Sequence, residues 1–159
     1  MKMKTKQITY ALLFLTVIGV GSCKKNDTTP ASTTVNFTAT LNGTSETPSN
    51  TSTATGTANF TYNTTTYILS GTVTFTGITP TGAHIHKGAV GVAGSVIFPL
   101  GSAPYTSPIS FTSVALDATQ RADLMANSYY ANIHSTAFPA GEIRGQLIEQ
   151  VSNSSNYVY

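Results

Sequence analysis

The feature that most constrains the fold of this chain is an alternation of apolar and polar residues with a period of two. Apolar side chains alternate with Asn and Thr over residues 35–41, and the pattern returns over 53–62 and 67–75. Because side chains on a strand point alternately to its two faces, each segment is predicted to be a half-buried strand. An Asn-Thr-Thr turn between the second and third segments predicts an antiparallel hairpin. Further strands are predicted at 83–86, 95–98, 109–114, 129–134 and 142–151.

Clusters of Gly, Pro, Ser and Asn separate these short segments. Many short strands at such spacing predict an all-β fold, an antiparallel sandwich or barrel. One stretch departs from the strand pattern. Asp117 is a natural N-cap with Gln120 three residues later, and Ala, Leu and Met follow at helical spacing. The sequence therefore predicts one short helix over about 118–126, ending near Asn127.

The first residues have the layout of an export signal. Lysines at positions 2, 4 and 6 precede an apolar run over 8–20, and two small residues stand before Cys23, the only Cys of the chain. The run is too short for a stable membrane span and is typical of a signal peptide over residues 1–22. The string Val-Gly-Ser-Cys resembles the lipobox of bacterial lipoproteins, which implies lipidation of Cys23. An uncleaved or ordinarily secreted chain is the alternative.

Polar residues follow the cysteine, and they predict a flexible tether over 23–34 before a β domain over 35–151 and a short tail over 152–159. Two lysines directly after Cys23 resemble the start of many outer-membrane lipoproteins. The expected location is the outer membrane of the cell envelope, with the domain periplasmic or surface-exposed and the membrane contacted through the N-terminal lipid.

Charge argues against nucleic-acid binding. The whole chain is formally +2, with eight basic and six acidic residues, but three of the basic ones precede Cys23. A chain cleaved at that point keeps five basic against six acidic side chains, a net charge of about −1. It therefore has no basic patch of the kind that holds nucleic acid.

Several strings together resemble the CHRD domain, the repeat named after chordin. They are Phe37–Gly43, Ala54–Ala58, Gly82–Gly88, Tyr130–Ser135 and Phe138–Leu147, which contain AHIH, NIH and PAGEIRGQ. The resemblance covers residues 35–148. It implies an immunoglobulin-like β-sandwich or barrel outside the cytoplasm, and it implies no particular reaction.

The three histidines of the chain all lie in these strings. His84 and His86 are two residues apart on one predicted strand, so their rings should leave the same face. A neighbouring strand could place His134 beside them. Three neutral imidazoles with a Glu or a water can complete a zinc or copper site, and Glu142 and Glu46 are the candidate fourth ligands. Such a site needs nitrogens about 3–3.5 Å apart, given metal–nitrogen bonds of about 2.0–2.1 Å.

A structural interpretation stands beside the metal site. The three rings could belong to a hydrogen-bonded polar cluster together with Asn132, Glu142 and Arg144. The spacing of Glu142 and Arg144 favours an ion pair on one face. Both interpretations predict that the three imidazole rings lie close to one another.

The sequence contains no complete catalytic set. Gly-x-Ser-x-Gly and Cys-His combinations are missing, and three histidines are too few for the two-metal site of a copper–zinc superoxide dismutase. The first hypothesis is therefore a lipid-anchored, non-enzymatic binding or structural module, with an unknown protein or polysaccharide as partner and no certain cofactor. The second is a mononuclear zinc or copper protein with redox or hydrolytic activity, which uses His84, His86 and His134.

Overall fold

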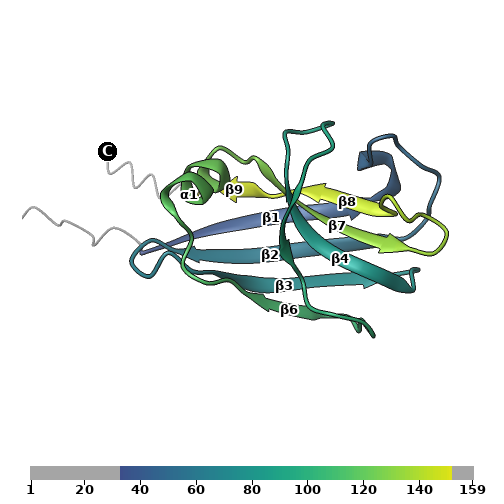
Figure 1. The fold of residues 1–159 in the computed structure, drawn as a ribbon, viewed down its shortest axis with the longest axis horizontal. Coiled ribbons are helices and arrows are strands. Elements are labelled where there is room, and N and C mark those ends of the chain that lie inside the picture. The colour runs from purple at the N-terminus through teal and green to yellow at the C-terminus, as the bar shows by residue number, and fades with distance from the viewer. Residues whose placement is uncertain (1–32, 152–159) are drawn as a thin grey trace, which may run out of the picture. The chain divides into compact units, whose positions relative to one another are not determined.

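The strands of the domain join into one antiparallel sheet (Figure 1). A computed structural model describes residues 33–151 of the chain. The strand order is β5-β4-β7-β8-β1-β2-β3-β6, and β9 also pairs with β1. The strands are β1 (Thr34–Asn42), β2 (Thr55–Asn63), β3 (Leu69–Thr76), β4 (Pro80–Lys87), β5 (Val96–Pro99), β6 (Ile109–Thr112), β7 (Tyr129–Ser135), β8 (Ile143–Gln146) and β9 (Ile148–Gln150).

The sheet curls until its two end strands meet through aromatic side chains. Strands β4 and β7 cross over the layer formed by β1, β2, β3 and β6 (Figure 1). Phe98 of β5 and Phe111 of β6 have ring centroids 5.7 Å apart, and Phe111 also packs edge-on against Phe60 of β2. The core between the layers is built from the inward positions of the alternating strands, as the prediction of an all-β sandwich or barrel requires. That prediction is confirmed.

The predicted hairpin is β2–β3, which pair in register from Thr55↔Thr76 to Tyr62↔Leu69. The single strand expected over 142–151 is instead divided into β8 and β9. The division falls at Leu147, whose side chain is fully buried and whose N–H donates to the carbonyl of Tyr129 on β7 at 2.9 Å. The chain then leaves β7, and β9 pairs with β1.

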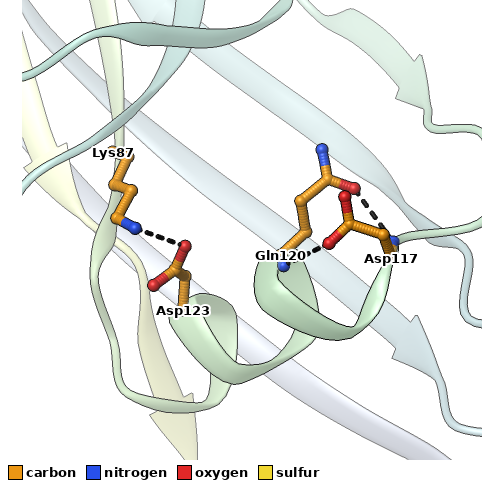
Figure 2. Close-up of polar contacts among 4 residues, drawn as sticks. All are labelled: Lys87, Asp117, Gln120 and Asp123. Carbon is orange, nitrogen blue, oxygen red and sulfur yellow. Dashed lines mark hydrogen bonds and ion pairs between the residues drawn. The ribbon is translucent and has the colours of Figure 1, made fainter.

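The short helix α1 (Ala118–Met125) begins where the sequence predicts (Figure 2). Asp117 accepts a hydrogen bond from the backbone N–H of Gln120 at 2.8 Å, and the Gln120 side chain accepts one from the N–H of Asp117 at 3.0 Å. An ion pair of 2.7 Å joins Asp123 of the helix to Lys87 at the end of β4. A single 3-10 turn, η1 (Gly43–Ser45), follows β1.

Several predictions concern residues outside the described range. The signal peptide over 1–22, the lipidated Cys23, most of the tether over 23–34 and the tail over 152–159 stay predictions. Within residues 33–151, no helix is long and apolar enough to cross a membrane.

Candidate metal centre

The three histidines project from one face of two neighbouring strands. His84 and His86 belong to β4 and His134 to β7, and these strands pair antiparallel with Gly82 opposite His134. The intervening residues of both strands, Ala83, Ile85, Ala131 and Ile133, are fully buried in the core. Because alternate residues of a strand face opposite sides, the imidazoles stand on the outward face of the sheet.

On that face the three rings form a tight cluster. Ring centroids are 5.1 Å apart for His84 and His134, 5.7 Å for His84 and His86, and 5.9 Å for His86 and His134. One nitrogen from each ring lies within 4.8 Å of the other two. The nitrogens of a tetrahedral site lie about 3–3.5 Å apart, which is less than this upper limit of 4.8 Å. A bound ion would therefore draw the rings closer together.

Backbone carbonyls determine which nitrogen of two rings carries the proton. His86 Nδ1 lies 2.9 Å from the carbonyl oxygen of Gly94, and His134 Nδ1 lies 3.1 Å from that of Pro139. A carbonyl oxygen can only accept, so each Nδ1 is the N–H donor and each Nε2 keeps its lone pair in the neutral ring. The nitrogens His86 Nε2, His134 Nε2 and His84 Nδ1 are buried and have no hydrogen-bond partner among residues 33–151.

Burial also keeps two of the rings neutral. It lowers the pKa of His84, and the charges that His134 and His86 would carry lower it further. Burial lowers the pKa of His134 as well, although the hydrogen bond to Pro139 opposes this shift. Neutral imidazole is the form that binds a metal ion, so the lowered pKa values of His84 and His134 favour the protonation state that ligation requires.

His86 is held by a stack of side chains from three strands. Its ring lies 4.9 Å from the Tyr130 ring at an interplanar angle of 12°, and the Arg144 guanidinium covers the Tyr130 ring at 3.4 Å. The Tyr130 hydroxyl accepts from the N–H of Gly94 at 3.0 Å, while the carbonyl of the same glycine receives His86 Nδ1–H. A side chain on Gly94 would collide with the carbonyl of Lys87. The loop after β4 can therefore approach His86 only through a glycine.

Gly82 leaves room for the other two rings. A Cβ atom at this position would lie 3.2 Å from His84 Cε1 and 3.6 Å from His134 Cδ2. Because Gly82 has no side chain, both imidazoles can pack close to the backbone of β4 at this position.

The sequence comparison agrees with this architecture. Residues 37–147, which contain the three histidines and all of the supporting contacts above, match the family described as CHRD domain. The chain belongs to the CHRD family. Comparison with curated proteins and with solved structures found no match.

Neither candidate glutamate lies in the histidine cluster of this CHRD domain. The group of side chains that could share an ion within residues 33–151 consists of the three histidines. The carboxylate of Glu142 accepts from the Ser52 hydroxyl at 2.7 Å. Glu46 instead accepts two hydrogen bonds from the Asn132 amide, at 3.1 and 3.2 Å.

The expected ion pair between Glu142 and Arg144 is wrong. Glu142 lies before β8 and turns to Ser52, whereas the Arg144 guanidinium donates to the carbonyls of Ala89 and Val92 at 2.9 and 3.0 Å. Burial raises the pKa of the Glu46 carboxyl, whereas the hydrogen bond from Asn132 and the positive charge of Arg144 lower it.

Asn132, Glu142 and Arg144 are nevertheless all buried, with 3%, 7% and 2% of their surface exposed. The supporting groups that sequence reasoning missed are the carbonyls of Gly94 and Pro139. No pattern of side chains marks a carbonyl that will accept from a histidine, so only the folded loops reveal them.

Proposed function

We propose that this CHRD domain binds one zinc or copper ion through His84, His86 and His134. The observation that carries the proposal is a cluster in which one nitrogen of each ring lies within 4.8 Å of the other two and each ring has a buried nitrogen without a hydrogen-bond partner in the described structure. In the neutral rings of His86 and His134, Nε2 carries a lone pair, because Nδ1 of the same ring donates its proton to a backbone carbonyl.

A purely structural polar cluster accounts less well for this arrangement. Buried polar atoms in proteins are nearly always hydrogen-bonded, because each unsatisfied one costs about 1–3 kcal/mol. A structural cluster would pair its nitrogens with one another or with nearby donors. The facing lone pairs of His86 Nε2 and His134 Nε2 instead repel each other, and a cation between them turns that repulsion into ligation.

The supporting contacts have the form that metal sites use. Ligating histidines commonly donate their second N–H to a carbonyl or carboxylate, which fixes the tautomer and the orientation of the ring. His86 and His134 each do so. The donor set is three neutral imidazoles, which suit zinc and copper, and it includes no thiolate to select between them.

The test is metal content and affinity. Purified protein, treated with chelator and then dialysed against Zn²⁺ or Cu²⁺, should retain one ion per chain, and the variants His84→Ala, His86→Ala and His134→Ala should each lose it. Glu149→Gln is the control for adventitious binding at an acidic side chain, and it should retain the ion. A wild type that releases the ion as readily as the three variants would refute the metal site.

We also propose that the domain is a binding module of the cell envelope rather than an enzyme, anchored through a lipid on Cys23. The support is the lipobox-like string and the tether in the sequence, together with the missing catalytic set. The domain would then store or deliver the metal ion, or bind a protein or polysaccharide at the cell envelope. Mass spectrometry of the membrane fraction should find a lipid-modified N-terminal Cys23, and Cys23→Ala should release the protein from membranes.

A further inference from the structure

One more buried polar atom lies beside the histidines without a partner. Asn132 is only 3% exposed, and its Oδ1 accepts no hydrogen bond from residues 33–151. Asn132 is the cross-strand neighbour of His84 and precedes His134 by two residues on β7, so all three side chains leave the same face. Residues 33–151 contain six buried side-chain atoms without partners, and four of them belong to these histidines and this asparagine.

The orientation of the Asn132 amide follows from its neighbours. Both oxygens of the Glu46 carboxylate lie within hydrogen-bond distance of Nδ2, and a carboxylate needs a donor, so the NH₂ group faces Glu46. Gly141 packs against the amide, since a Cβ there would lie 2.8 and 2.9 Å from the two amide heteroatoms. The oxygen is therefore fixed as an acceptor that lacks a donor.

The four atoms have complementary needs. The lone pairs of His86 Nε2 and His134 Nε2 favour a cation, His84 Nδ1 adds a third lone pair when the proton of that ring is on Nε2, and one oxygen requires a proton donor. We infer that the fourth coordination position of the metal takes water, or another small oxygen ligand that carries a proton, and that this ligand donates a hydrogen bond to Asn132 Oδ1. The inference rests on the metal site proposed above. It makes Asn132 a positioning residue that selects the exogenous ligand, with Glu46 and Gly141 holding its amide.

Azide is a suitable probe because it can bind a metal ion but cannot donate a hydrogen bond. When azide replaces water in the wild type, Asn132 Oδ1 loses its donor inside the protein, and this loss weakens azide binding. In Asn132→Leu, which has a similar volume and no acceptor, that penalty is gone. Azide affinity of the Cu²⁺-loaded protein should therefore rise by about five- to tenfold, the ratio that corresponds to one such hydrogen bond.

The experiment titrates azide into the full chain loaded with Cu²⁺ and follows the azide-to-copper charge-transfer band. Asn132→Leu leaves Glu46 without its donors, so the double variant Glu46→Leu/Asn132→Leu, which replaces both partners by apolar groups, is measured beside it. Asn59→Leu, which changes an exposed amide on β2, is the control and should match the wild type. All variants should keep one Cu²⁺ per chain.

Each outcome of the azide titration either supports or overturns the inference. Tighter azide binding in the Leu variant, or in the double variant if the single one does not fold, supports the inference. Equal azide affinity in wild type and variants overturns it and leaves the metal site intact. Loss of Cu²⁺ from both Leu variants under conditions where the wild type keeps it would make Asn132 a direct ligand, which also overturns it. Failure of the wild type to hold Cu²⁺ overturns the metal site itself.

Discussion

Two adjacent tyrosines give a sharp test of how hydrogen bonding stabilises this domain. The Tyr130 hydroxyl accepts a hydrogen bond from the N–H of Gly94, whereas the Tyr129 hydroxyl is buried and has no partner within residues 33–151. Burial raises the pKa of Tyr129 to about 12, so its hydroxyl stays protonated and neutral at ordinary pH. Removing each hydroxyl by substitution with Phe changes one oxygen atom and keeps the ring.

Only the Tyr130 substitution should lower the stability of the domain. Tyr130→Phe removes one hydrogen bond and leaves the partly buried N–H of Gly94 without its acceptor, which should cost about 1–2 kcal/mol. Tyr129→Phe removes a buried polar group that has no partner, so the free energy of unfolding should stay the same or rise by up to about 1 kcal/mol. The difference between the variants should then be about 2 kcal/mol.

Urea unfolding at neutral pH, with the metal removed by chelator, measures both values on one protein background. The denaturant dependence should be equal in the two variants, so the shift in midpoint reports stability directly. Thermal unfolding should show the same order, with roughly 4 °C for each kcal/mol in a domain of this size. If Tyr129→Phe is as destabilising as Tyr130→Phe, the Tyr129 hydroxyl has a hydrogen-bond partner and is not an unsatisfied buried group.

Much of the fold follows from the alternation of side chains along the strands. This parity predicts the β2–β3 hairpin and places His84 and His86 on one face, and the structure agrees with both. The capping box at Asp117 depends only on residues three apart, so it too could be predicted. These are local properties, determined by neighbours within a few positions of the chain.

The rest of the site depends on contacts between distant residues. Glu46 and Asn132 are 86 positions apart, and their pairing needs the loop after β1 to fold over β7. The spacing of Glu142 and Arg144 suggested an ion pair, but spacing within a strand does not apply to a residue that precedes it. In the structure, the Arg144 guanidinium instead donates hydrogen bonds to carbonyls of the loop after β4 and lies over the Tyr130 ring. The hydrogen-bond partners of these side chains depend on the strand order and on the path of the loops, and a short sequence pattern determines neither.

Three further measurements test the helix, the site and its charge. Asp117→Ala removes the N-cap and should lower the free energy of unfolding by about 1 kcal/mol without changing metal content. Gly82→Ala brings a Cβ within 3.2 Å of His84 and should weaken metal binding about tenfold, measured by competition with a chromogenic chelator. The last concerns pH. Because the pKa values of His84 and His134 are lowered in the folded protein, the unfolded chain binds protons first as pH falls below about 6.5. Metal-free protein should therefore be fully stable above that pH and lose stability below it, and His84→Gln should show a smaller loss. Glu46, whose pKa is raised, gives the opposite slope at lower pH, but it is common to both proteins and cancels in their difference. Urea unfolding of both proteins at pH 5 and pH 7.5 measures this difference, and equal losses would mean that His84 is not held neutral by the fold.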